Sequence, residues 1–271
     1  MNGEPPHDKP TSYLLAVEDR PYLDSDELRP FRLALEFNKV DLALKEQGIA
    51  STIVVFGGSR ILSPEKAEEA LTAAKGPEAL ERARREKTLT AWYEEARRFG
   101  RIASERGGAL VPHGGIRRNV IATGGGPGIM EAANRGASEV GAPTIGFNIS
   151  LPHEQYPNPY TTPDLTFRFH YFAMRKMHFA MRAAALVVFP GGFGTMDELF
   201  ELLTLRQTGK MTKPLPVVLY DQAFWTRTIN FKSFVEAGLI AERDLGLFTY
   251  ANTPEEAWRE LLRCGLPIPK E

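Results

Sequence analysis

The sequence VIATGGGPGIMEAA, residues 120–133, places a glycine run between a short apolar run and an amphipathic stretch, and ALVVFPGGFGTMDE, residues 185–198, repeats this arrangement. Each is typical of a buried strand that passes into a helix. Glycine lets backbone N–H groups approach an anion, and the start of the helix adds the positive end of its dipole. The pair therefore predicts two phosphate-binding loops in one crevice at the carboxyl edge of a parallel sheet.

Apolar and amphipathic segments alternate along the rest of the chain. Apolar runs predict further strands over 53–56, 144–148 and 216–220, an extended segment over 165–171 and a short strand near 247–249. Helical periodicity predicts helices over 31–47, 64–106 with a break at Gly76-Pro77, 129–140, 172–184, 195–207, about 224–237, and 254–264. This alternation predicts an α/β fold, a single Rossmann-like doubly wound parallel sheet with helices on both faces.

The domain organisation follows from length and proline content. Residues 1–30 contain scattered prolines and acids, which predicts a flexible proline-rich leader. The chain has 271 residues, of which 43% are hydrophobic, enough for a substantial core. We expect residues 31–271 to form one nucleotide-binding domain.

Composition excludes several classes of partner. The chain has 33 Lys and Arg residues against 34 Asp and Glu residues, so it lacks the basic excess of a general nucleic-acid binder. The single cysteine, Cys264, excludes a disulfide framework and a multi-cysteine zinc site. No apolar run reaches the ~18 residues of a membrane span, and the first residues contain no signal core. We expect a cytoplasmic protein without a membrane partner.

Two familiar nucleotide motifs are absent from the sequence. Ile129 stands where the dinucleotide fingerprint G-x-G-x-x-G requires its last glycine, and no G-K-[ST] triplet completes a P-loop. A backbone phosphate cradle remains, and its alternative is a pair of tight structural turns. The turn Gly57-Gly58-Ser59-Arg60 after the first strand adds a hydroxyl and a guanidinium at the same sheet edge.

Glu198 is the first candidate for chemistry. In Thr195-Met196-Asp197-Glu198 it would occupy the third helical position beside the phosphate cradle. The alternative is a capping box, in which Thr195 caps the helix and Glu198 only completes the cap. Asp197 would either favour the helix dipole or accept sugar hydroxyl groups.

Arg175 and Lys176 are adjacent cations in a stretch otherwise rich in Phe, Met and Ala. The forked guanidinium of Arg175 suits a phosphate or a carboxylate, and the alternative is a surface pair beside an apolar stripe. His170 and His178 flank the pair without a companion cysteine or an H-E-x-x-H motif, so we expect no metal site there.

The residues TGGGPGIMEAA, 123–133, and PGGFGTMDE, 190–198, resemble the two signatures of the LONELY GUY (LOG) family, the cytokinin riboside 5′-monophosphate phosphoribohydrolases. Many members were long labelled lysine decarboxylases. The resemblance runs from about Thr52 to Tyr220. The family's M-H-E-R-K motif reads Phe172-Ala173-Met174-Arg175-Lys176 here, which keeps both cations. The leader and the long charged helix are more similar to the larger bacterial members.

The resemblance implies hydrolysis of the N-glycosidic bond of a nucleoside 5′-monophosphate, without a cofactor, by a protein that is at least a homodimer. It implies catalytic roles for Arg175 and Glu198. It implies substrate contacts by Ser59, Arg60, Gly124, Gly125, Gly126, Gly128, Lys176, Gly191, Gly192, Gly194, Thr195 and Asp197. Two alternatives are a nucleotide or cofactor carrier, like the molybdenum-cofactor carrier proteins, and a decarboxylase with pyridoxal phosphate on a lysine such as Lys176.

Overall fold

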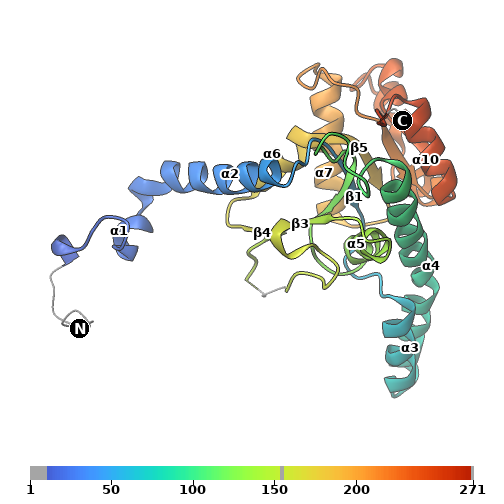
Figure 1. Ribbon diagram of the computed structural model, residues 1–271. Coiled ribbons are helices and arrows are strands. Elements are labelled where there is room, and N and C mark those ends of the chain that lie inside the picture. Colours follow the sequence, from blue (N-terminus) through green and yellow to red (C-terminus); the bar gives the residue numbers. More distant parts are fainter. Residues whose placement is uncertain (1–10, 153–155, 270–271) are drawn as a thin grey trace.

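A computed structural model describes residues 11–152 and 156–269 of the chain. Within these residues, seven strands form one sheet in the order β4-β3-β2-β1-β5-β6-β7 (Figure 1). Every neighbouring pair of strands is parallel, which confirms the predicted α/β fold with a single parallel sheet. The strands are β1 Thr52–Phe56, β2 Val120–Thr123, β3 Thr144–Ile149, β4 Thr166–Phe169, β5 Ala183–Val188, β6 Val217–Tyr220 and β7 Thr249–Ala251.

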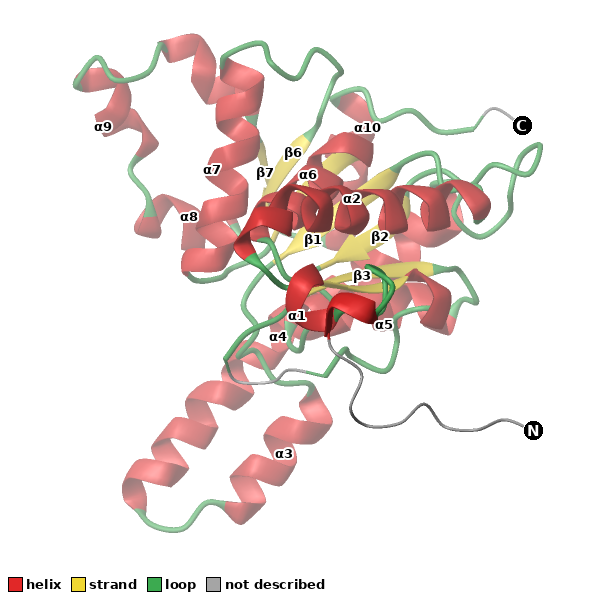
Figure 2. Ribbon diagram, turned by 90° about the vertical axis from the view of Figure 1, so that its left-hand side faces the viewer, coloured by secondary structure: helices red, strands yellow, loops and turns green. Residues whose placement is uncertain are grey.

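Helices cover both faces of the sheet, so the sheet is doubly wound as predicted. The α-helices are α1 Arg20–Leu23, α2 Arg29–Glu46, α3 Pro64–Ala73, α4 Pro77–Arg106, α5 Ile129–Glu139, α6 Phe172–Arg182, α7 Phe193–Gln207, α8 Gln222–Thr228, α9 Phe231–Glu236 and α10 Pro254–Arg263. The break at Gly76 is where α3 turns back into α4, since Gly76 has a positive φ of 86° and Pro77 opens the next helix. Figure 2 shows the two helices side by side, projecting from the sheet.

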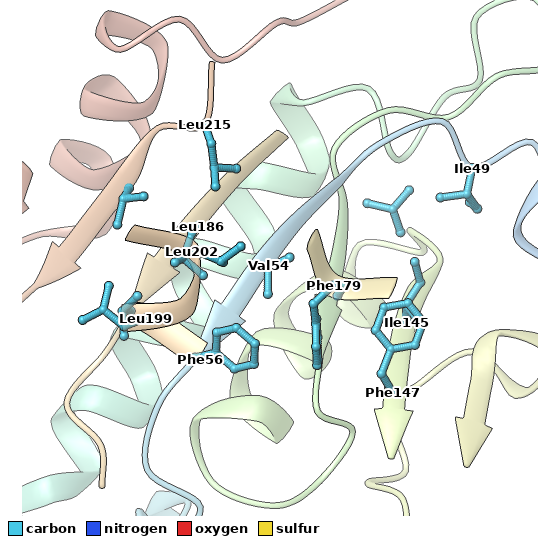
Figure 3. Close-up of a cluster of buried hydrophobic side chains, with 14 of the residues drawn as sticks. Ile49, Val54, Phe56, Ile145, Phe147, Phe179, Leu186, Leu199, Leu202 and Leu215 are labelled. Atoms are coloured by element: carbon cyan, nitrogen blue, oxygen red, sulfur yellow. The ribbon is translucent and has the colours of Figure 1, made fainter. Parts of the chain in front are cut away.

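Alternate residues of the central strands belong to two hydrophobic cores, one on each face of the sheet. Side chains of α2, α6 and α7 pack on one face around Val54, Phe147 and Leu186, as Figure 3 shows for part of this cluster. Side chains of α4, α5 and α10 pack on the other face. Both faces of β1 and β2 are buried, which explains why their sequences are continuous apolar runs rather than alternating ones.

The order of the strands reverses at β1. The chain moves from β1 outward through β2, β3 and β4, and then returns to place β5 on the other side of β1. In an open parallel sheet, ligands bind in the crevice that forms beyond the carboxyl ends of the two strands at such a reversal. The turns after β1 and β5 therefore flank the expected binding crevice.

Three segments differ in detail from the sequence-based expectations. The predicted helix 224–237 is two helices, α8 and α9, because the chain is extended at Ile229 between them. The last strand is β7, residues 249–251, because residues 242–247 form a short 3₁₀ helix. Residues 1–10 of the predicted leader lie outside the described residues, while residues 20–23 and 26–28 form short helices and α2 begins at Arg29.

None of the helices in the described parts of the chain is long and apolar enough to cross a membrane.

Candidate active site

A cavity of about 1070 Å³ lies at the reversal between β1 and β5. The turn after β1 contributes Gly57, Gly58, Ser59 and Arg60, and the turn after β5 contributes Pro190 to Thr195. Arg175 of α6 and Asp197 and Glu198 of α7 also line it. The structure thus brings Ser59, Arg60, Arg175, Gly191, Gly192, Gly194, Thr195, Asp197 and Glu198 to one cavity, from segments far apart in the sequence.

The second glycine run opens α7 two residues earlier than predicted. Gly192 is the N-cap and Phe193 is the first helical residue, so Thr195 lies inside the helix and no side chain caps it. The first intrahelical bond runs from the Met196 N–H to the Gly192 carbonyl, at 3.0 Å. The N–H groups of residues 193–195 have no acceptor within the described parts of the chain. Unpaired N–H groups at a helix start attract anions.

Glu198 is a buried carboxyl group without a hydrogen-bond partner among residues 11–152 and 156–269. Because the N-cap is Gly192, Glu198 is one turn too far along α7 to form the capping box that was an alternative from the sequence. Burial raises the pKa of Glu198 to about 7, and the positive charges of Arg175 and Lys176 only partly oppose this effect. A carboxyl group that titrates near neutral pH in a cavity is a typical candidate for acid–base chemistry.

Arg175 is fixed in place by β3 and by the first glycine run. Its Nε donates a hydrogen bond to the Phe147 carbonyl oxygen at 2.8 Å, and its Cζ lies 5.3 Å from the centre of the Phe179 ring. A Cβ atom at Gly124 would lie 2.5 Å from its Nη2. Burial lowers the pKa of Arg175, and Glu198 opposes this. The group remains a cation at any ordinary pH.

Lys176 does not line the cavity, and its side chain contacts α7 instead. Its Nζ forms ion pairs with Asp197 Oδ1 at 2.8 Å and Glu201 Oε2 at 3.1 Å. Burial lowers the pKa of Lys176, but the hydrogen bonds to these two carboxylates outweigh it and leave the pKa above its ordinary value. Lys176 is therefore a cation that joins α6 to α7, and Asp197 is its partner as well as a lining residue.

The first glycine run, Gly124 to Gly128, lies behind the cavity wall. Gly124, Gly125, Gly126 and Gly128 are buried and do not line the cavity. A Cβ atom at Gly128, which has a φ of 74°, would lie 2.3 Å from the Gly58 carbonyl oxygen. These glycines therefore let the turn after β2 pack closely against the turn after β1. The sequence predicted that this run lines the crevice, whereas the structure places it behind the wall, because the reversal lies between β1 and β5 and not between β1 and β2.

Asn158 holds the first glycine run through its backbone and its side chain. The Asn158 N–H donates to the Gly125 carbonyl at 2.8 Å, and its Nδ2 donates to the Gly126 carbonyl at 3.1 Å. The Gly125 N–H donates in turn to Thr123 Oγ1 at 2.9 Å. The proline-rich segment around Asn158 thus anchors the turn that contacts Arg175.

Sequence reasoning missed the aromatic part of the cavity. Trp92 of α4, Phe224 of α8 and Phe234 of α9 line it, as do Phe172 and Phe193 at the starts of α6 and α7. Trp92 lies in the stretch 64–106 that the sequence predicts to be helical, and nothing in the sequence around it indicates a cavity. The signal that could have found Phe224 and Phe234 is their place after β6, the strand next to β5 in the sheet.

His170 and His178 do not line this cavity. His178 is fully buried and stacks on Phe37 at 5.1 Å, and burial lowers its pKa to about 4. His170 is exposed beside Tyr171. In the described ranges, no group of three or more His, Cys, Asp or Glu side chains could hold a metal ion.

Comparison with known proteins points to one family. Residues 130–261 match the family model described as possible lysine decarboxylase. The chain is 30% identical over 91 residues to a probable cytokinin riboside 5′-monophosphate phosphoribohydrolase of Oryza sativa subsp. japonica, and 30% identical over 87 residues to a cytokinin riboside 5′-monophosphate phosphoribohydrolase of Arabidopsis thaliana. These matches cover 34% and 32% of this chain.

The resemblance to the LOG family is confirmed. A further LOG enzyme of Oryza sativa subsp. japonica is 30% identical over 157 residues, which is 57% of this chain. The matched stretches span only 40% of the length of each of the first two relatives and 62% of the third. The likeness to the larger bacterial members of the LOG family stays a prediction.

Two solved structures are distantly similar to the chain. The molybdenum cofactor binding protein from the phototrophic bacterium Rippkaea orientalis has 18% sequence identity and a TM-score of 0.47, over 79% of this chain and 95% of that one. A structural-genomics target, TM1055, has 19% identity and a TM-score of 0.49, over 79% of this chain and 99% of that one.

Proposed function

We propose that the protein hydrolyses the N-glycosidic bond of a nucleoside 5′-monophosphate to free base and ribose 5-phosphate. One observation carries the proposal: the buried, unpartnered carboxyl group of Glu198 shares a cavity with the open N-terminus of α7. A carboxyl group suits chemistry at the anomeric carbon of a sugar, and the N-terminus of a helix suits a phosphate. The LOG-type relatives, which carry the names of phosphoribohydrolases, support the same reaction.

The 5′-phosphate would bind at the start of α7. The unpaired N–H groups of residues 193–195 and the positive end of the helix dipole attract an anion. Ser59 and Arg60, exposed on the opposite turn, add a hydroxyl group and a guanidinium to the same cavity. Binding energy from this remote phosphate would hold the sugar in place for reaction.

Glu198 would act on the anomeric carbon. Cleavage of an N-glycosidic bond passes through an oxocarbenium-like state, whose positive charge a carboxylate stabilises. Alternatively the carboxylate accepts a proton from a water molecule as the water oxygen bonds to that carbon. The base leaves with the electron pair of the broken bond and takes up one proton of the water, whose hydroxyl group remains on the anomeric carbon. Arg175, held by Phe147 and Phe179, would orient the nucleotide or assist the departing base.

Two other readings have weaker support. A decarboxylase would need a lysine that is free to form a Schiff base, whereas Lys176 is engaged by two carboxylates that keep it protonated. A nucleotide carrier would need the phosphate cradle but not Glu198. Glu198→Gln separates a hydrolase from a carrier. Under the carrier hypothesis the variant binds its ligand as the wild type does, and neither protein releases base.

The proposal is tested with a panel of nucleoside 5′-monophosphates, including cytokinin riboside, purine and pyrimidine members, and the matched nucleosides. Free base is followed by chromatography. We expect base release from monophosphates and at least ~100-fold less from nucleosides, since the nucleosides forgo the remote phosphate contacts. Glu198→Gln should release base at least about 100-fold more slowly and still bind ribose 5-phosphate. Equal rates with and without the phosphate would contradict the role of α7.

We also propose a homodimer in which a second copy covers the mouth of the cavity. Phe193 is 96% exposed and Phe172 is 52% exposed, and large exposed apolar side chains at one place indicate an interaction surface. Light scattering should give twice the monomer mass. Phe193→Asp should shift the protein toward monomer, whereas Leu239→Asp, at a residue 73% exposed beyond α9, should not.

A further inference from the structure

The cavity has an aromatic side that the proposed chemistry does not use. Trp92 and Phe224 meet there edge to face, with ring centres 5.7 Å apart and planes at 74°, and we call this pair the aromatic corner. Ile229 and Phe234 line the same cavity. Phe224 follows β6 and Arg60 follows β1. Because β6 and β1 flank β5 in the sheet, Phe224 and Arg60 enter the cavity from opposite sides of β5.

One carboxylate fixes the aromatic corner. Asp221 directly follows β6 and is the N-cap of α8. It has a left-handed conformation with a φ of 70°, which is rare for a residue other than glycine. Its Oδ2 accepts a hydrogen bond from Trp92 Nε1 at 2.9 Å, and its Oδ1 accepts one from the Phe224 N–H at 3.0 Å. The strained residue thus holds α4 and the start of α8 together, so that both rings keep a fixed orientation.

The aromatic corner offers faces but no free side-chain donor. The Trp92 N–H is used by Asp221, and the Thr228 hydroxyl donates to the Phe224 carbonyl at 2.7 Å. Ile229 and Phe234 are apolar. Among the described lining residues on this side, no side-chain N–H or O–H remains to read the edge of a ligand.

We propose that the aromatic corner holds the base of the nucleotide by stacking and selects it by ring area rather than by its hydrogen-bonding edge. This rests on the proposed function. Stacking on an aromatic side chain tolerates any base, because every base has a π-face. A site that pairs with a substrate edge can reject an analogue strongly, but an apolar site discriminates weakly between exocyclic groups. The preferred substrates are therefore purine 5′-monophosphates as a class, with pyrimidines poorer.

The first test compares adenosine, inosine, guanosine, cytidine and uridine 5′-monophosphates in base release. We expect kcat/KM for the three purines to agree within about 10-fold, and the pyrimidines to be lower, because an apolar surface distinguishes little beyond size. A difference above about 100-fold between the adenosine and inosine monophosphates would overturn the proposal, since these two differ only at the edge of the base.

The second test changes the aromatic corner. Trp92→Ala should weaken the binding of adenosine 5′-monophosphate by about 10-fold to 100-fold, the usual effect of removing a stacking platform, and leave ribose 5-phosphate unchanged. Phe224→Leu keeps an apolar side chain without the ring and should show a smaller loss of the same kind. Trp92→Phe should retain most of the binding. Trp258→Phe, at a buried residue of α10 that does not line the cavity, is the matched control.

Fluorescence separates failure of this inference from failure of the proposed function. Adenosine 5′-monophosphate should quench the tryptophan emission of the wild type and not that of Trp92→Phe, whereas ribose 5-phosphate should quench neither. Quenching without base release would leave the stacking site intact and refute the hydrolase. Base release without quenching, or with equal selectivity in Trp92→Ala, would refute the stacking site. Thermal melting curves identify any variant that fails to fold.

Discussion

At the scale of single residues, the buried carboxyl group of Glu198 lowers the stability of the folded protein once it is charged. It is 5% exposed and lacks a hydrogen-bond partner within the described residues, so its charged form is poorly solvated. Burial raises its pKa to about 7, against the pull of the Arg175 charge. If the carboxylate is the active form, base release should rise with pH between 6 and 8 and then level off. Glu198→Gln should lose at least about 100-fold at every pH.

The same shift predicts the stability of the variant. A carboxyl group whose pKa rises from 4.5 to about 7 on folding stabilises the protein below pH 4.5, and that stability is lost as the pH rises through 7. Glu198→Gln should therefore be more stable than the wild type at pH 8, by about 2 to 3 kcal/mol, and closer to it at pH 5. Urea unfolding at both values measures this. Glu105→Gln, an exposed position on α4, should show no such difference.

Sequence alone left two roles open for Glu198 for a physical reason. A capping box and an active-site acid have the same pattern, T-x-x-E, and differ only in where the helix begins. Here the beginning lies at Gly192, a residue with no side chain to mark it. Arg175 and Ser59 could be placed from the sequence because each lies in or next to an element with a clear pattern.

At the scale of elements, Gly191 and Gly194 at the start of α7 have different roles. A Cβ atom at Gly191 would lie 2.1 Å from Thr195 Oγ1, whereas a Cβ atom at Gly194 would meet nothing within 4 Å. Gly191→Ala should therefore displace Thr195, cost about 1 to 3 kcal/mol of stability and weaken ribose 5-phosphate binding. Gly194→Ala should leave the melting temperature unchanged or slightly higher.

Thermal denaturation and calorimetric titration with ribose 5-phosphate check this pair. Equal melting temperatures for the two variants would show that the turn relaxes around the added methyl group. The pair also separates two uses of glycine that a sequence cannot distinguish, since close packing and anion binding both require a missing Cβ. The first glycine run illustrates this, because it was predicted to line the crevice and instead packs behind it.

Elements were more predictable than their order. The strands β1, β2 and β5 are continuous buried apolar runs, which a sequence displays directly. The order β4-β3-β2-β1-β5-β6-β7 depends on which way each crossover turns, and no local pattern records this. The aromatic corner was missed for the same reason, since Trp92 and Phe224 meet only once α4 and β6 are placed.

At the scale of the whole molecule, α2 joins the N-terminal segment to the domain, and its second half supplies its buried apolar residues. Phe31 and Leu35 are each 66% exposed, and Figure 1 shows this end of α2 extending away from the sheet. Further along, Val40 and Leu44 are buried in the core. Asp41 accepts a hydrogen bond from Arg182 of α6 at 2.6 Å, with both side chains nearly buried.

We propose that the boundary of the domain lies just before α2, and two deletions test it. Removing residues 1–28 discards the carbonyl partners that Arg32 finds at Leu23 and Ser25 and the exposed ion pair of Asp26 with Arg29, but no residue of the two cores. Folding and base release should therefore persist with a melting temperature within about 5 °C of the full chain. Removing residues 1–46 also discards Val40 and Leu44 and leaves Arg182 buried without its carboxylate.

The longer deletion should not fold. Loss of a buried aliphatic side chain costs about 2 to 5 kcal/mol, and an unpaired buried charge costs about 3 to 5 kcal/mol, so the sum reaches the whole stability of a typical domain. Circular dichroism and thermal denaturation of both products measure the outcome. Loss of folding or activity in the shorter deletion would place residues 1–28 inside the domain, and a stable product of the longer one would mean that α2 contributes no part of the core.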